Sequence, residues 1–188
     1  MSTATLPTTT TWSIDTFHSE ILFKVKHLVI TTVTGRFNKF SGEVETENDD
    51  FSNAKIKFTA DTKSIDTGAE GRDTHLKSAD FFDAEKYPEL TFSSKSFTKK
   101  GEDYILLGDL TIRDVTKPVE LKVEYGGTTK DPFYGKTKAG FELNGKINRK
   151  DFGLVWGALT ETGGAVVGDE IKIHAEIQLV KQAELVNA

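Results

Sequence analysis

The sequence contains no cysteine among its 188 residues. Disulfide bonds, thiolate metal sites and cysteine nucleophiles are therefore excluded. A chain without cysteine suits reducing and oxidising compartments equally, so this absence does not indicate where the protein works.

Clustered positive charge is also lacking. The 24 Lys and Arg residues are dispersed among 29 Asp and Glu residues, which leaves a net charge of −5. Because no basic block offsets the repulsion of phosphates, we expect no nucleic-acid partner.

Long apolar runs are missing as well. No window approaches the roughly 20 apolar residues that a membrane span needs, so we expect none. The N-terminus has neither the basic nor the apolar segment of a secretory signal, so we expect a cytoplasmic protein, although a trimmed mature chain would look the same. We expect a disordered N-terminal tail at 1–11, one domain at 12–182 and a C-terminal tail at 183–188.

Familiar catalytic motifs do not occur. The sequence has no GxSxG elbow, phosphate-binding loop or HExxH pair. Gly126-Gly127 and Gly163-Gly164 are typical of hairpin turns. We therefore expect a protein that is not an enzyme and needs no cofactor.

What the sequence does have is alternation of apolar and polar residues, with thirteen Phe residues available for the interior. This period of two is typical of half-buried strands. It occurs in eight segments, at about 20–26, 39–45, 55–60, 90–92, 104–112, 119–125, 138–147 and 171–179. An all-β fold follows, either a sandwich or an eight-stranded antiparallel barrel, and the sequential hairpins favour the barrel.

The first apolar segment suggests the shape of this barrel. A strand from Trp12 to His27 would have about 16 residues and span about 53 Å. This length predicts a long narrow tube, which suits an extended apolar ligand.

One segment, 72–88, interrupts the alternation. Thr67 and Glu70 have the spacing of a capping box, which predicts a helix over about 68–78. Its apolar stripe is thin, so the helix should lie across a barrel mouth. The interpretation is a crossover, about residues 68–86, that closes one end.

The second half of the crossover carries carboxylates and a pair of aromatic residues. Asp80 is placed to cap a short turn that presents Phe81 and Phe82. Asp80 and Asp83 could instead form an acid/base pair or a calcium site, but their spacing matches no calcium loop. Capping is therefore the favoured interpretation.

The histidines predict no metal site. His18 and His27 are nine residues apart and would face opposite sides of an unbulged strand. His174 lies on the polar face of the last strand. His75 is the best placed for chemistry, although a hydrogen bond between helix and barrel rim is its favoured role.

The inward apolar positions have two interpretations, since such side chains either fill a core or line a ligand pore. Together they predict a pore. Its predicted residues are Phe23, Val25, Phe40, Phe58, Phe92, Leu110, Leu121 and Phe141.

A series of short motifs, taken in order, resembles the YceI-like family of polyisoprenoid-binding proteins over roughly residues 12–180. The motifs are Trp12-Ser13-Ile14-Asp15, His18-Ser19, His27-Leu28, Gly35-Arg36-Phe37, Ser64-Ile65-Asp66-Thr67, Arg72-Asp73, His75-Leu76, Asp80-Phe81-Phe82-Asp83, Tyr87-Pro88, Thr91-Phe92, residues 108–113, residues 115–119 and residues 148–154. Asp114, between residues 108–113 and 115–119, stands where the family usually has glycine.

The resemblance implies an extended, lipocalin-like barrel whose pore takes the tail of an isoprenoid, an isoprenoid quinone or another long-chain amphiphile. Family members are often periplasmic or secreted, some are implicated in stress responses, and a homodimer is compatible with the family. The missing signal means that a periplasmic carrier role does not transfer to this chain.

The resulting hypothesis is a non-enzymatic carrier or store for a long apolar ligand, since each buried CH₂ contributes about 0.8 kcal/mol. The head group would meet Arg72, His75, Arg113 or Arg149 at the mouth. One alternative is a lipid-modifying enzyme that uses Arg72, Asp73, His75 and Asp80. The other is a filled barrel that serves as an interaction module without a ligand.

Overall fold

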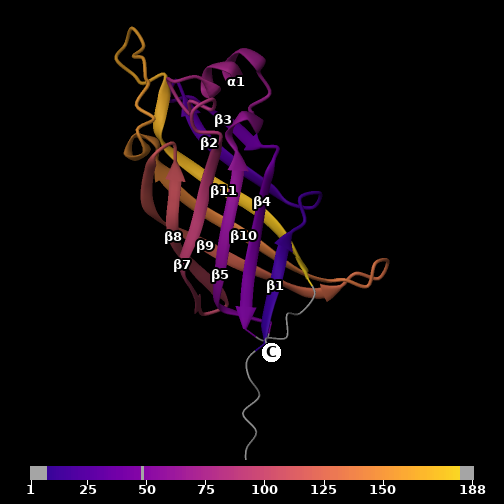
Figure 1. Ribbon diagram of the computed structural model, residues 1–188. Coiled ribbons are helices and arrows are strands. Elements are labelled where there is room, and N and C mark those ends of the chain that lie inside the picture. Colours follow the sequence, from indigo (N-terminus) through magenta and orange to yellow (C-terminus); the bar gives the residue numbers. More distant parts are fainter. Residues whose placement is uncertain (1–7, 48, 183–188) are drawn as a thin grey trace, which may run out of the picture.

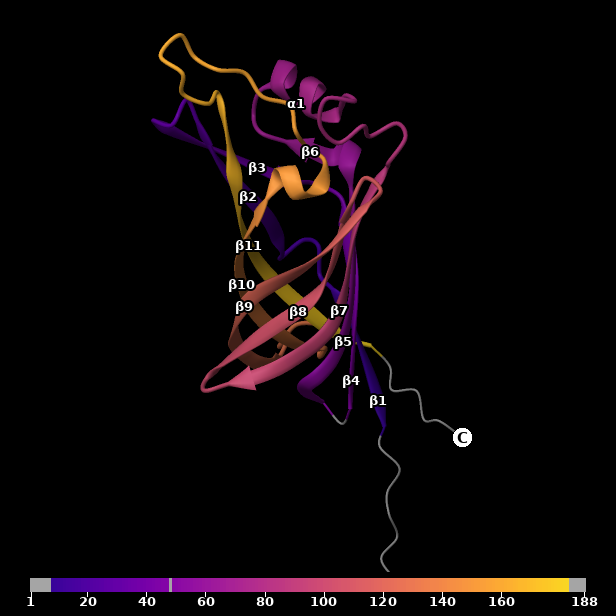
Figure 2. The same cartoon turned by 90° about the vertical axis from the view of Figure 1, so that its left-hand side faces the viewer.

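The computed structural model describes residues 8–47 and 49–182, which form a barrel of antiparallel strands with a short helix over one end (Figure 1). The elements are β1 (Thr9–Ile14), β2 (Glu20–His27), β3 (Thr31–Phe37), β4 (Phe40–Glu47), β5 (Asp50–Asp61), β6 (Ile65–Asp66), α1 (Glu70–Lys77), β7 (Glu89–Lys100), β8 (Asp103–Ile112), β9 (Val115–Lys130), β10 (Thr137–Asn148) and β11 (Val167–Lys181), with 3₁₀ turns at Thr62–Ser64 and Arg149–Phe152. We call the end that carries α1 the upper end and the opposite end the lower end (Figure 2).

The barrel is closed because β11 pairs back with β1. The sheet order is β1-β4-β5-β7-β8-β9-β10-β11, and the β1–β11 pairing joins its two edges. After a break in the chain that follows β1, β2 continues along β11 in the same direction as β1. β3 then pairs with β2, and β6 pairs with β3. The predicted eight-stranded antiparallel barrel is thus confirmed.

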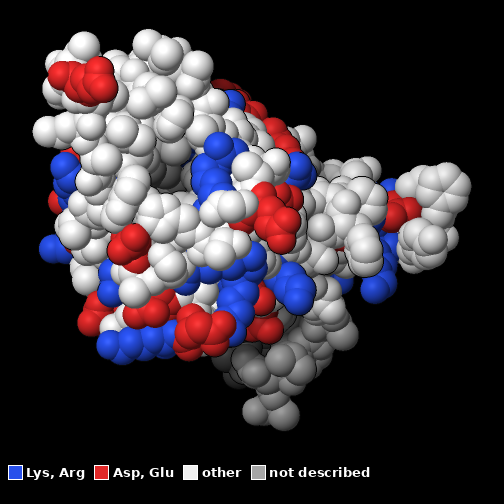
Figure 3. All heavy atoms as spheres, turned by 90° about the horizontal axis from the view of Figure 1, so that it is seen from above, with Lys and Arg blue, Asp and Glu red and all other residues white. Residues whose placement is uncertain are grey.

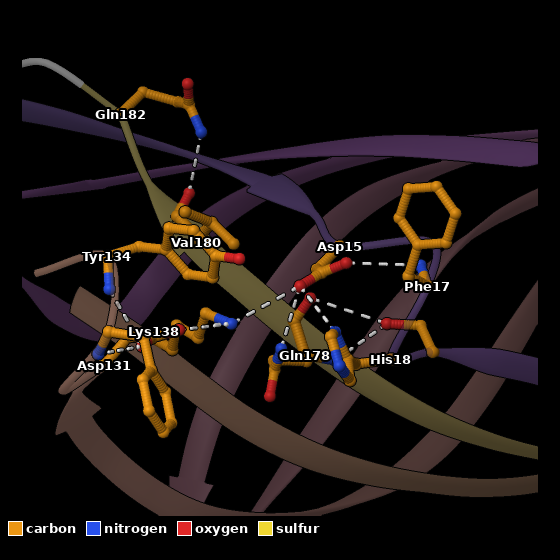
Figure 4. A network of polar contacts seen from close by, with 11 residues as sticks. Asp15, Phe17, His18, Asp131, Tyr134, Lys138, Gln178, Val180 and Gln182 are labelled. Carbon is orange, nitrogen blue, oxygen red and sulfur yellow. Dashed lines mark hydrogen bonds and ion pairs between the residues drawn. The ribbon is translucent and has the colours of Figure 1, made fainter. Parts of the chain in front are cut away.

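The prediction of one continuous strand from Trp12 to His27 is wrong, because β1 ends at Ile14 and β2 begins at Glu20. Asp15 causes the interruption. One of its carboxylate oxygens accepts a hydrogen bond from the Phe17 amide at 3.2 Å, and the other lies 2.9 Å from Nδ1 of His18 (Figure 4). Such local side-chain bonds compete with the sheet ladder, and apolar alternation does not report them.

The expected N-terminal tail at 1–11 is also too long. β1 begins at Thr9, and Thr10 is buried, so the barrel starts before Trp12. Residues 1–7 and the predicted C-terminal tail at 183–188 lie outside the described residues. In the part of the chain that the structure describes, no helix has the length and apolar character needed to cross a membrane.

The lower end of the barrel is filled by aromatic rings that come from the strands. Phe51 packs against Trp12 and Phe141 with ring centroids 5.1 and 5.0 Å apart. Phe97 stacks on Tyr104 at 4.5 Å. All five side chains are buried, so the aromatic residues close this end from the inside.

The upper end is covered by α1 and the segment that follows it, as the crossover prediction requires (Figure 2). The predicted capping box does not form, because Ala69 is the N-cap and no side chain caps it. Instead, the amide and hydroxyl of Thr67 both donate to Asp73. The predicted cap at Asp80 is also wrong, because its carboxylate lies 2.8 Å from Nε2 of His75.

Candidate binding cavity

The barrel encloses an apolar cavity of about 250 Å³. Its wall extends from Phe51 and Phe97 at the lower end to Leu76 and Phe81 at the upper end. Small-molecule sites usually occupy about 300–1,000 Å³, so this volume lies just below the lower limit of that range. The side chains therefore do not fill the barrel completely.

Inward-facing glycines help to keep the cavity open. A methyl group on Gly108 would overlap the ring of Phe92, and one on Gly35 would overlap the ring of Phe23. Each ring thus lies directly over a glycine of the neighbouring strand. Because the glycine has no side chain, the ring packs close to the wall and leaves space along the barrel axis.

The structure places most of the predicted pore residues at the cavity wall. The cavity is lined by seven of the eight, namely Phe23, Val25, Phe58, Phe92, Leu110, Leu121 and Phe141. Phe40 is the exception. It is the first residue of β4 and packs against Phe58 at a ring distance of 6.1 Å, but it does not line the cavity.

Sequence reasoning missed the part of the wall that covers the upper end. Leu76 of α1, Phe81 and Phe82 of the crossover, and Leu154 also line the cavity. None of them lies on a strand, so the alternation that identified the pore residues does not apply to them. The Phe81-Phe82 pair in an otherwise polar segment was the available signal.

The polar groups of the crossover lie around this cover. The His75 ring contacts the rings of Phe81 and Trp156 edge-on, with centroids 5.1 and 4.8 Å apart. The His75 and Asp80 side chains are 38% and 53% exposed, and neither lines the cavity. Seen from above, the uncharged residues at this end surround a hollow (Figure 3).

The predicted head-group contacts separate into two kinds. Arg149 borders the cavity but is only 3% exposed, and its guanidinium group has five N–H donors. These donors are matched by the carbonyl oxygens of Gly168, Leu154, Trp156 and Val167 and by a carboxylate oxygen of Asp169. The structure therefore assigns Arg149 to holding the segment between η2 (Arg149–Phe152) and β11, with no N–H left for a ligand.

Arg72 and Arg113 retain unused donors. Among the described residues, Arg72 donates from Nε and Nη2 only to Thr67. Arg113 lies over the Tyr87 ring, 5.6 Å from its centroid, and its buried Nε has no hydrogen-bond partner among the described residues. A buried donor without a partner is costly, so Arg113 is the better placed of the two to gain from a polar ligand group.

A closed antiparallel barrel with an apolar interior cavity belongs to the class of lipocalin-like barrels, which hold small molecules. The sequence profile of the YceI-like domain matches residues 12–179, and the chain belongs to the YceI-like family.

Similar proteins agree with this assignment. A UPF0312 protein of Staphylococcus aureus strain N315 is 37% identical over 169 residues, which are 90% of this chain and 96% of that protein. The YceI protein of Campylobacter jejuni superposes with a TM-score of 0.69 at 34% identity and covers 84% of this chain and 90% of its own. Burkholderia cenocepacia BcnA gives 0.75 at 25% identity, with 88% and 98% covered.

A polyisoprenoid binding domain from Saccharophagus degradans, implicated in plant cell wall breakdown, has the same fold. Its TM-score is 0.66 at 16% identity, with 91% of this chain and 98% of that chain covered. At this identity the likeness concerns the fold alone.

Proposed function

We propose that this protein binds a long-chain apolar ligand inside the barrel and carries or stores it without changing it. A polyisoprenoid, an isoprenoid quinone or a fatty-acid-like amphiphile has the required chemistry. The observation that carries the proposal is the apolar cavity, with Phe23 and Phe92 lying over glycines at its wall. A solved domain with the same fold is described as polyisoprenoid-binding, so this ligand class is the first to test.

Burial alone supplies the binding free energy in this proposal. Each CH₂ group that leaves water contributes about 0.8 kcal/mol, before the cost of ordering the chain. The head group would remain at the upper end, where Arg113 and Arg72 have free donors. Selection among ligands would then depend on tail length and on one or two polar contacts.

The two alternatives have less support. A lipid-modifying enzyme would need its acid and base groups at the ligand. Asp73 instead accepts two hydrogen bonds from Thr67, and neither His75 nor Asp80 lines the cavity. A filled barrel that binds no ligand would have no open space inside, whereas this barrel has a cavity. A cytoplasmic location and a homodimer stay predictions.

Native mass spectrometry of the protein purified from cells is the direct test. We expect a lipid at about one per chain, released by organic extraction and identified by its mass. A protein that carries no lipid, and takes none up from isoprenoid quinones, polyprenyl compounds or fatty acids, would disprove the proposal.

A pair of variants on β8 tests the location of the ligand. Leu110 lines the cavity, whereas Leu107 on the same strand is 40% exposed. We expect Leu110→Gln to reduce lipid uptake at least about tenfold, and Leu107→Gln to bind like the wild type. Because a polar core residue can impair folding, Leu121→Phe provides a second variant that reduces the cavity while keeping it apolar. Folded Leu110→Gln and Leu121→Phe proteins that still bind normally would place the ligand elsewhere.

A further inference from the structure

The outer face of the barrel carries a row of four glutamates on four neighbouring strands. The strand register places Glu142 of β10 opposite both Glu124 of β9 and Glu176 of β11, and Glu176 opposite Glu20 of β2. Directly opposed side chains on antiparallel strands have Cβ atoms about 5 Å apart, and like charges at this spacing are destabilising. The row therefore needs a source of positive charge.

The protein supplies that charge only at one end of the row. Lys122 lies 3.4 Å from Glu124. Within the described residues, Glu142 and Glu176 form no ion pair with a Lys or Arg, and their charged-group neighbour is His174. The centre of the row thus has two carboxylates and one imidazole.

His174 is oriented as a metal ligand would be. Its Nδ1 lies 2.9 Å from the side-chain oxygen of Asn144, whose amide group in turn donates to Glu142 at 2.9 Å. This chain of bonds places the proton of a neutral imidazole on Nδ1. Hydrogen bonding of one ring nitrogen is the usual way in which proteins orient a histidine whose other nitrogen binds a metal.

The other nitrogen, Nε2, faces Glu176. The distance from Nε2 to the Glu176 carboxylate oxygen is 3.6 Å, which is too long for a hydrogen bond. It is close to the ~3.3 Å that separates two ligand atoms on a tetrahedral zinc ion with bonds of about 2.0–2.1 Å. One donor atom from each of Glu142, His174 and Glu176 lies within 4.8 Å of the other two, and the Glu142 carboxylate is 3.7 Å from Nδ1 of His174.

Open space lies beside the two glutamates. A surface hollow is lined by Glu142 and Glu176 together with Glu124, Gly140 and His18. A methyl group on Gly140 would meet nothing within 4 Å, so the absent side chain leaves part of the hollow open. His18 and Gln178, which border the hollow, are drawn in Figure 4. The hollow therefore leaves room for water molecules next to the two carboxylates.

We propose that Glu142, His174 and Glu176 form a divalent transition-metal site on the outside of the barrel, with zinc as the best-matched ion. One nitrogen and two carboxylate oxygens suit zinc, whereas calcium and magnesium prefer oxygen ligands throughout. The site is separate from the lipid cavity, since these three side chains point outward from β10 and β11. It would neutralise the glutamate row and clamp the two strands together.

Isothermal titration of Zn²⁺ into the untagged full chain tests the proposal. We expect saturable binding of one ion per chain, weakened at least about tenfold in His174→Gln and in Glu176→Gln. Glu45→Gln on the outer face of β4 and His27→Gln at the end of β2 are matched controls that should bind normally. The visible absorption of bound Co²⁺ should show a nitrogen ligand that disappears in His174→Gln.

Three results would overturn the proposal. Absence of saturable binding would mean that the three side chains do not hold a metal ion. Unchanged binding in His174→Gln and Glu176→Gln would place the ion elsewhere. Equal affinity for Mg²⁺, Ca²⁺ and Zn²⁺ would indicate general attraction to the carboxylates. None of these readouts depends on whether the cavity binds lipid.

Discussion

The two ends of the barrel are closed in different ways. At the lower end, rings from the strands themselves contact one another, and Trp12 and Phe97 are only 1% and 3% exposed. At the upper end, a separate segment covers the cavity, and no residue of α1 is buried. The cover touches the interior through a few apolar side chains, including Leu76 and Phe82.

This difference indicates which end opens. The lower end cannot open without separating strands of the core, so its opening is tied to global unfolding. In the upper cover, α1 has no buried residue, although Phe81 after it is buried, and the rim is held by exposed polar contacts such as His75 with Asp80. Segments of this kind open locally at a smaller free energy than the core, so we infer that a ligand enters at the upper end.

Removing an aromatic ring at the lower end should have the largest effect. Phe51 is 5% exposed and contacts Trp12, Tyr125 and Phe141. We expect Phe51→Ala to lower the free energy of unfolding by about 3–5 kcal/mol, measured by urea denaturation. The lengthened cavity should also accept longer tails. Phe133→Ala, at a side chain that is 88% exposed, is the control that should change little.

A substitution in the cavity wall tests what keeps the cavity open between the two ends. A methyl group on Gly108 would overlap the Phe92 ring and lie 2.6 Å from the carbonyl oxygen of Ser93. We expect Gly108→Ala to cost about 1–3 kcal/mol and to push the ring into the cavity, which reduces lipid uptake. Gly140→Ala, where the methyl group meets open space, should retain uptake. Normal uptake by Gly108→Ala would show that the glycine does not maintain the cavity.

The strands could be predicted from the sequence, whereas the break at Asp15 and the start of α1 could not. Strand positions and the cavity wall followed from alternation, because a period of two assigns each residue to one face. The interruption at Asp15 did not, because it depends on side-chain bonds to Phe17 and His18. The capping box at Thr67 and Glu70 failed because Asp73 competes for the same hydroxyl group.

The proposed metal site on the outer face shows a second limit of prediction from sequence. Glu142 and Glu176 are 34 residues apart, and their pairing depends on the register between β10 and β11. Spacing within one segment does not reveal such a pair, so the position of His174 on the polar face gave no sign of its partners. Arg149 was assigned to a head group for a similar reason, since its carbonyl partners come from a loop whose path the sequence does not reveal.

The hydrogen bonds of Asp15, beside the lower end, should make a smaller contribution to stability that depends on pH. Burial raises the pKa of Asp15, but hydrogen bonds from His18, Gln178 and the Phe17 amide outweigh it, and the pKa is lowered overall. Lys138 links Asp15 to Asp131 at 3.6 and 3.0 Å (Figure 4). A lowered pKa in the folded state means that this stabilisation is complete above the unfolded value near 3.9 and is lost as the pH falls through the folded value.

We therefore expect Asp15→Asn to destabilise the barrel by about 1 kcal/mol at neutral pH. The difference in the free energy of unfolding between Asp15→Asn and the wild type should shrink as the pH falls below about 4. Urea denaturation at a series of pH values measures this difference, with Glu102→Gln in the exposed turn between β7 and β8 as the control. A deficit independent of pH would mean that the Asp15 charge does not stabilise the break between β1 and β2.

The smallest stability change is expected at the upper cover, where it should nevertheless alter ligand exchange. Gly71 lies in α1, and a methyl group there would meet nothing within 4 Å. Alanine should stabilise the helix by up to about 1 kcal/mol, because it loses less backbone entropy than glycine on folding. If the cover must unfold locally to release a ligand, Gly71→Ala should slow release by up to about fivefold while global unfolding changes little. Stopped-flow displacement of a fluorescent fatty acid measures that rate, and an unchanged rate would indicate that the ligand leaves by a route that does not require α1 to open.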